Sequence, residues 1–160
     1  MTASNTFRSI ILAGATLLAA SAYQAQEVSA TEADQSRPES ELRADMRDAM
    51  ERDTDSVNTA LVFNNPSADV VHVFCSAFDS NGRYEGRRTV RIPGRGVRYL
   101  RASDFSSGDD YIGSALCQSR ARVAASAVLL APGAITNLDV IQADAWDESN
   151  RVRFPLIATY

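Results

Sequence analysis

The chain has 160 residues, of which 45% are hydrophobic and 22% are charged, and its formal net charge is −4 at pH 7. A chain of this length accommodates one ordinary domain. The overall negative charge argues against nucleic acid as a partner.

The first 22 residues have the features of a secretory signal peptide. Arg8 precedes an apolar run from Ile10 to Ala20, which is too short to span a bilayer because a transmembrane helix needs about 20 residues. Small residues suit cleavage after Ala22, and residues 28–30 offer a second cleavage site. The alternative, a buried amino-terminal helix, is disfavoured because the run lacks a polar face. We therefore expect a periplasmic or secreted protein without a transmembrane segment in its mature chain.

Residues 23–56 are expected to form an acidic linker that contains one short helix. Residues 23–39 are polar and acidic, so burial cannot offset the entropy of ordering them. Between about residues 40 and 52, apolar side chains recur at spacings of three and four, and Glu39 and Arg43 lie four apart, which predicts an amphipathic helix. An isolated helix of this length is marginal in water, so it must dock on the domain or fray.

From residue 57 onward, short apolar segments alternate with turn residues, which predicts an all-β domain over residues 57–160. The expected strands cover residues 59–65, 69–78, 87–92, 96–101, 111–118, 123–131, 135–142 and 152–160. Gly, Pro, Asn and Asp lie between most of them and favour turns. This spacing indicates a single antiparallel β-sandwich of about seven or eight short strands, or a barrel.

Three segments, LVFNNPSADVVHVFCSAFDSNGR, TVRIPGRGVRYLRASDF and VAASAVLLAPG, resemble the small bacterial β-sandwich domains that include the sensory-rhodopsin transducer family. In those domains an Asn-Pro/Ser turn opens a strand, an Asp-x-x-Gly turn follows it, and a basic strand runs into a Ser/Asn-Asp pair. The resemblance covers residues 58–160 and implies the sandwich fold. Those transducers work inside the cell and this chain carries an expected export signal, so the resemblance implies no photoreceptor role and no site residues.

The two cysteines of the chain, Cys75 and Cys117, both lie in predicted strands. Because cysteines of exported chains are usually paired, we expect a disulfide between them, the alternative being two buried thiols. His72, the one histidine, lies three positions from Cys75 and is expected on the opposite face of its strand. This arrangement disfavours a Cys/His nucleophile pair, and we predict no catalytic residue and no cofactor.

Three acidic clusters are candidate metal sites. Residues 79–82 (Asp-Ser-Asn-Gly) resemble a calcium loop but lack its closing glutamate, so we predict a hairpin turn. Residues 109–110 and the acidic loop of residues 144–148 are expected to be solvated loops, with a hard-cation site as the alternative. Trp146 is expected to cover the end of the domain, with stacking on a sugar or a partner as the alternative. We therefore predict no metal site.

Residues 87–101 hold six arginines and no acidic residue. A hairpin closed by residues 93–96 would bury Val90 and Ile92 and place two of the arginines, at positions 91 and 98, on one outer face. Such a positive surface attracts phosphate, sulfate or carboxylate groups, whereas the alternative is an ordinary solvated face. The candidate residues for binding an anion or a partner are Arg87, Arg91, Arg95 and Arg98.

These patterns predict an exported, non-catalytic interaction module that presents the arginine-rich hairpin to an acidic glycan, a lipid phosphate or an acidic protein surface. The alternative is an exported enzyme or enzyme accessory domain with a carboxylate site near Asp104, Asp109 and Asp110. The acidic segment of residues 27–55 is expected to lie loosely across the arginines as a salt-sensitive rival, the alternative being a solvated tail.

Overall fold

A computed structural model describes residues 34, 36–51, 56–108, 110–142 and 150–160. These residues belong to one compact unit, residues 32–160. The expected signal peptide over residues 1–22, the linker up to residue 33, Asp109 and the acidic loop around Trp146 lie outside the described residues. In the part that is described, no helix has both the length and the apolar character needed to cross a membrane.

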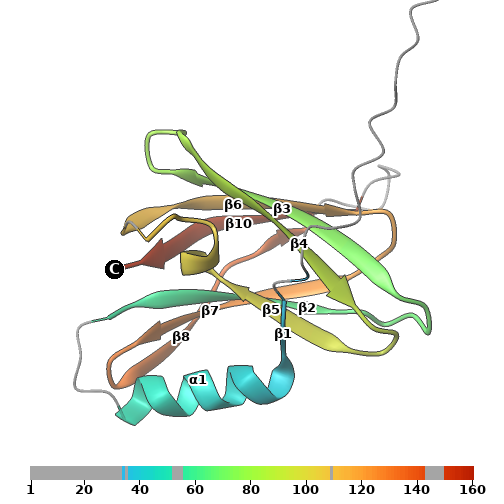
Figure 1. Cartoon of the computed structure of the whole chain (residues 1–160), viewed down its shortest axis with the longest axis horizontal. Helices are drawn as coiled ribbons and strands as arrows, with labels where there is room; N and C mark the ends of the chain where they lie inside the picture. Colours follow the sequence, from blue (N-terminus) through green and yellow to red (C-terminus); the bar gives the residue numbers. More distant parts are fainter. Residues whose placement is uncertain (1–33, 35, 52–55, 109, 143–149) are drawn as a thin grey trace, which may run out of the picture. The chain divides into compact units, whose positions relative to one another are not determined.

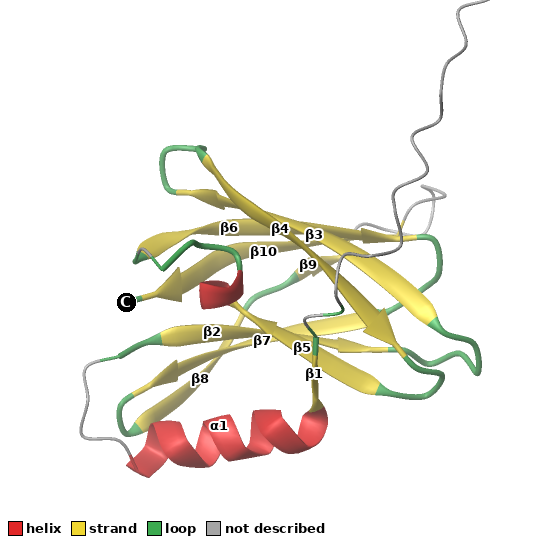
Figure 2. Cartoon of the chain, in the orientation of Figure 1, coloured by secondary structure: helices red, strands yellow, loops and turns green. Residues whose placement is uncertain are grey.

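The protein is mostly β, with one α-helix and ten strands in a curled antiparallel sheet (Figures 1 and 2). The helix α1 spans Glu39–Glu51, and a short 3-10 helix, η1, spans Ala102–Asp104. The strands are β1 (Arg37–Pro38), β2 (Asn58–Asn64), β3 (Val71–Asp79), β4 (Tyr84–Ile92), β5 (Val97–Arg101), β6 (Tyr111–Ser119), β7 (Ala124–Ala131), β8 (Ala134–Leu138), β9 (Ile141–Gln142) and β10 (Asn150–Thr159). The all-β class and the helix are therefore confirmed. The predicted strand over residues 135–142 is divided into β8 and β9, and β1 was not predicted.

The sheet has two halves that face each other across the core (Figure 1). The first half has the strand order β1-β5-β2-β7-β8, and the second half has the order β9-β10-β6-β3-β4. β2 and β10 join them at the pair Asn58 and Thr159. Phe63 of the first half and Phe154 of the second meet edge to face in the core, with ring centroids 5.7 Å apart. Side chains from both halves thus form one hydrophobic core.

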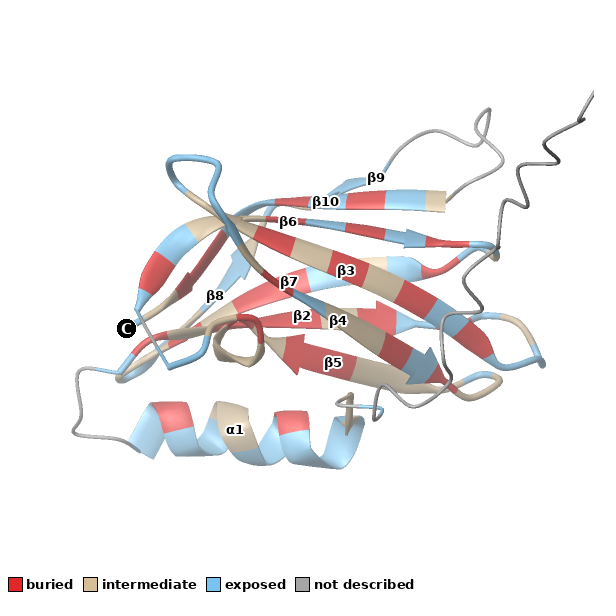
Figure 3. Ribbon diagram, turned by 45° about the horizontal axis from the view of Figure 1, so that its top comes forward, coloured by how far each residue is buried: buried red, intermediate tan, exposed pale blue. Residues whose placement is uncertain are grey.

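Burial alternates along the strands of the second half, as Figure 3 shows. In β3, Val71, Val73 and Cys75 are buried and His72 is exposed, because successive side chains of a strand point to opposite faces. The predicted inward positions of Val90 and Ile92 in β4 are confirmed. The outward-facing residues of β3, β4, β6 and β10 therefore form a single outer side of the second half.

The predicted disulfide between Cys75 and Cys117 is present, with a sulfur–sulfur distance of 2.03 Å. The two residues are direct cross-strand partners on β3 and β6, and both are fully buried. His72 lies on the opposite face of β3 from Cys75, as predicted.

The helix α1 packs on the outer side of the first half (Figure 2). Its buried residues Leu42 and Ala49 share a hydrophobic cluster with Tyr99 and Val128. The carbonyl oxygen of Ala49 also accepts a hydrogen bond of 3.0 Å from the backbone N–H of Gly133 in the β7–β8 turn. Of the two outcomes expected for this short helix, docking and fraying, docking occurs, on β5, β7 and β8.

The predicted hairpin between residues 87–92 and 96–101 is wrong. β4 pairs with β3 in the second half, whereas β5 pairs with β1 and β2 in the first half. The turn between them packs on the loop after β2, because the side-chain amide of Asn65 donates to the carbonyl oxygens of Pro93 (3.1 Å) and Asp69 (2.6 Å). The chain therefore crosses between the halves where the sequence indicated a hairpin.

The β3–β4 connection is a tight hairpin turn, which confirms the turn predicted at residues 79–82. The Asp79 carboxylate accepts hydrogen bonds of 2.8 Å from the backbone N–H groups of Asn81 and Arg83. Gly82 adopts a φ of 80°, which favours glycine. One oxygen of Asp79 is thereby occupied by the turn itself.

Candidate binding face

The four arginines predicted to bind an anion do not lie on one surface. Arg87 and Arg91 are exposed on the outer side of β4. Arg95 is exposed in the β4–β5 turn, where it adopts a φ of 56°. Arg98 pairs across β5 and β2 with the fully buried Phe63, so it lies on the inner side of the first half. The expected common face of Arg91 and Arg98 is therefore wrong.

Another set of side chains surrounds Arg87 and Arg91 on the outer side of the second half. The strand registers align them in two rows and one further pair. These are Arg87, Ser76, Leu116 and Arg153; Thr89, Phe74, Gln118 and Arg151; and Arg91 with His72. We call the surface formed by these ten residues the arginine face.

Arginines lie at both margins of the arginine face, on β4 and on β10. Because three strand spacings separate these strands, the two margins are about 14 Å apart. Arg87, Arg91 and Arg153 have no ion pair within the described residues. The guanidinium carbon of Arg87 lies 5.6 Å from the centroid of the Phe74 ring, a cation–π distance that keeps the charged head at the surface.

Few described carboxylates lie near the arginine face. At the far end of β3 and β4, Asp79 and Glu85 both pair with Arg83, at 3.4 and 3.0 Å. At the edge of β4, a carboxylate oxygen of Asp34 accepts a hydrogen bond of 3.4 Å from the backbone N–H of Arg91. The side chains of Arg87 and Arg153 therefore carry positive charge that no described carboxylate pairs with.

The arginine face also exposes apolar side chains. Leu116, at its centre, is 45% exposed, and Ile112 projects from the same side of β6. Ile141 is the β9 partner of Arg153 and is 56% exposed, so it extends the face beyond β10. The alternating colours of Figure 3 show this side of the second half, on which no described element packs.

A shallow hollow of about 400 Å³ adjoins the arginine face beside His72. It is lined by Val70, Val71, His72, Phe74, Arg120 and Ala121. Arg120 directly follows β6 and is exposed. The hollow therefore combines apolar walls with one guanidinium and one imidazole.

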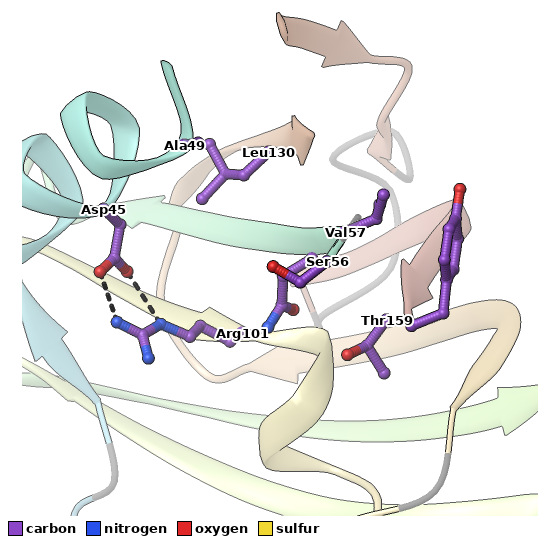
Figure 4. Close-up of a pocket in the computed structure, with 9 residues that line it drawn as sticks. Asp45, Ala49, Ser56, Val57, Arg101, Leu130 and Thr159 are labelled. Atoms are coloured by element: carbon purple, nitrogen blue, oxygen red, sulfur yellow. Dashed lines mark hydrogen bonds and ion pairs between the residues drawn. The ribbon is translucent and has the colours of Figure 1, made fainter. Parts of the chain in front are cut away.

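A second pocket lies between α1 and the first half (Figure 4). Its charged groups bind each other: the Asp45 carboxylate accepts hydrogen bonds of 2.5 and 2.8 Å from the guanidinium of Arg101. Tyr99 donates a further hydrogen bond of 2.5 Å to Asp45. Burial and this hydrogen bond raise the pKa of Tyr99 above its ordinary value, so its hydroxyl remains a donor at neutral pH. These contacts hold α1 to the sheet.

Part of the acidic segment is therefore docked, contrary to the loose association predicted for residues 27–55. Asp45 contacts Arg101, and the guanidinium of Arg37 binds both carboxylate oxygens of Asp104 at 2.5 and 2.8 Å. Because these pairs are partly buried and bidentate, they are stronger than the exposed pairs that the sequence suggested. The residues of the sheet and of η1 in these pairs are Arg101 and Asp104, whereas Arg91 meets the segment only through its backbone hydrogen bond to Asp34.

The carboxylates proposed for an enzyme site do not converge among the described residues. Asp104 is bound by Arg37 and also accepts a hydrogen bond of 2.7 Å from the backbone N–H of Arg101. Asp110 is exposed, and Asp109 lies outside the described residues. Within the described ranges, no group of three or more His, Cys, Asp or Glu side chains is placed to hold a metal ion.

Sequence reasoning missed Arg151 and Arg153, the arginines on β10. The segment Asn-Arg-Val-Arg-Phe alternates polar and apolar residues, which is the signal for two outward arginines on a half-buried strand. The sequence does not show that this strand lies three strands away from β4 in the sheet, so it gives no reason to group its arginines with Arg87.

No protein family model, no curated protein and no solved structure matches this chain.

Proposed function

We propose that the protein is an exported, non-catalytic interaction module, built as a β-sandwich, whose arginine face binds an acidic partner. The observation that carries this proposal is the difference between the two outer sides of the sheet. Helix α1 covers the first half, whereas the second half exposes arginines together with apolar side chains and has no described element on it.

The charge of this surface favours an anionic partner. Guanidinium groups form strong bidentate hydrogen bonds with phosphate, sulfate and carboxylate groups. Clustered charges of one sign also create a field that speeds the encounter with an oppositely charged surface. Arg87, Arg91 and Arg153 have no ion pair within the described residues, so an external anion competes with no described carboxylate for them.

The binding role is favoured over an enzymatic one by the state of the candidate catalytic groups. Both cysteines form the disulfide, and Asp104 is bound by Arg37. The buried disulfide also supports an oxidising compartment and hence export.

Heparin chromatography of the full chain tests the proposal, because heparin is a soluble polyanion and the experiment contains no lipid bilayer. We expect the double variant Arg87→Glu/Arg153→Glu to elute at clearly lower salt than the unmodified chain. The control is Arg43→Glu/Arg47→Glu, which makes the same charge change on the exposed side of α1. Equal shifts for both variants, with unchanged circular dichroism, would show that only net charge matters and would reject the face.

A further inference from the structure

Resting on the proposed function, we propose that the partner of the arginine face is a bilayer rich in anionic phospholipid, and that the hollow beside His72 and Arg120 receives a lipid phosphate group. The proposal commits to a membrane surface because of how cations and apolar side chains are mixed on this side of the sheet.

The exposed apolar residues are spread over the face and are not gathered in a groove. Ile112, Leu116 and Ile141 project from β6 and β9, and they are 45 to 56% exposed. A protein partner would need a matched apolar anchor for each of them, together with carboxylates at fixed positions. A bilayer offers hydrocarbon and anions everywhere on its surface, so scattered groups find partners without matched geometry.

The arginines lie where they can reach headgroups while the centre of the face meets the lipid boundary. They occupy the two margins, about 14 Å apart, with Leu116 between them. Long arginine side chains place their apolar stems along a nonpolar surface and their guanidinium groups at the phosphate level. Leu116 thus forms an apolar centre between two cationic margins, and Ile141 lies beyond the β10 margin.

The hollow at the edge of the face fits one headgroup. Arg120 supplies donors for a phosphate oxygen pair, and His72 supplies a further donor. Val70 is 43% exposed, and Val70 and Phe74 offer apolar walls to the glycerol and upper acyl chain of the same lipid. His72 and Phe74 line the hollow and also belong to the arginine face. The hollow therefore lies on the same side of the sheet as the arginines.

Co-sedimentation of the full chain with vesicles tests this inference. We expect binding to vesicles of phosphatidylglycerol and phosphatidylcholine in equal amounts, and little binding to pure phosphatidylcholine. Each basic residue near an anionic surface contributes about 1 kcal/mol, or about fivefold in the partition coefficient. The variant Arg87→Gln/Arg153→Gln should therefore bind about 25-fold more weakly, and Arg120→Gln about fivefold more weakly. The matched control Arg43→Gln/Arg47→Gln should bind as the unmodified chain does.

The contribution of the apolar centre is tested separately with Leu116→Ser. This variant keeps every charge, so a loss of vesicle binding with unchanged heparin retention supports insertion at the lipid boundary. Unchanged vesicle binding would overturn the role of the apolar centre.

Three outcomes separate this inference from the proposed function. Retention on heparin through the arginine face without binding to phosphatidylglycerol vesicles overturns the bilayer and leaves the interaction module standing. Failure on both overturns both. Complete release from vesicles by inorganic phosphate, at ionic strength held constant with NaCl, overturns the lipid source and assigns the hollow to free phosphate.

Discussion

Asp79 controls the β3–β4 turn through its carboxylate. The backbone N–H of Arg83, followed by that of Asn81, donates to this carboxylate and holds the pKa of Asp79 below its ordinary value of 3.8. Because the folded-state pKa is lowered, the stability that the ionised group contributes is complete above pH 3.8. It is lost as the pH falls through the folded value.

We therefore expect Asp79→Ala to lower the free energy of unfolding at pH 7 and to have a smaller effect at pH 3. Urea denaturation at the two pH values measures both differences. The comparison variant is Asp110→Ala, which removes an exposed carboxylate outside this turn. An Asp79→Ala effect that is equally large at both pH values would show that the carboxylate charge plays no part.

Individual residues also decide where the chain crosses between the halves. A Cβ atom placed on Gly94 would lie 1.9 Å from the carbonyl oxygen of Ala68, so only glycine allows the β4–β5 turn to approach the loop after β2. The backbone N–H of Arg95 donates to the carbonyl oxygen of Ser67 at 2.8 Å. These contacts join residues that are distant in sequence, which is why local turn chemistry alone predicted a hairpin.

The strands could be predicted from the sequence, but which strands pair with one another could not. Turn residues between apolar segments located most strands, and alternation in β4 predicted that Val90 and Ile92 point inward, because these patterns depend only on adjacent residues. Pairing depends on which edges meet in three dimensions. For example, Asp139 and Val140 separate β8 from β9, and these two strands pair with β7 and β10 in opposite halves.

The apolar side of helix α1 holds the helix against the sheet. Leu42 is buried against the sheet, whereas Met50 is 52% exposed. We expect Leu42→Ala to lower the free energy of unfolding by about 2 kcal/mol, because it removes buried methyl groups from a well-packed cluster. Met50→Ala should change it by less than about 0.5 kcal/mol.

Urea denaturation followed by circular dichroism measures these two values. Similar effects of Leu42→Ala and Met50→Ala would contradict the docking of α1 described above.

For the whole molecule, the disulfide is the one covalent link between strands among the described residues. It joins positions that are 42 apart in sequence. In the chain-entropy model, closing a loop of this length lowers the entropy of the unfolded chain and so raises its free energy by about 4 kcal/mol. We expect Cys75→Ala/Cys117→Ala to lower the free energy of unfolding by up to this amount, as measured by guanidinium denaturation. A reducing agent should destabilise the unmodified chain and leave the double variant unchanged; destabilisation of both would point to another cause.

The arginine face could be predicted from sequence only in part. The density of arginines in residues 87–101 indicated a positive surface, and Arg87 and Arg91 do lie on it. Its other margin comes from Arg151 and Arg153, about 60 residues away in the chain. No local pattern shows that β10 and β4 flank the same pair of strands, because that arrangement follows from the packing of the whole sheet.

The position of the disulfide within the second half has a consequence for how the arginines are spaced. Cys75 and Cys117 hold β3 and β6 in one register, and these two strands separate β4 from β10. A slip that kept the same side chains outward would move by two residues, or about 7 Å. The covalent bond prevents this slip between β3 and β6, the two strands that lie between the margins. For the anionic partner proposed above, a surface whose two central strands are linked in this way would lose little backbone entropy on binding.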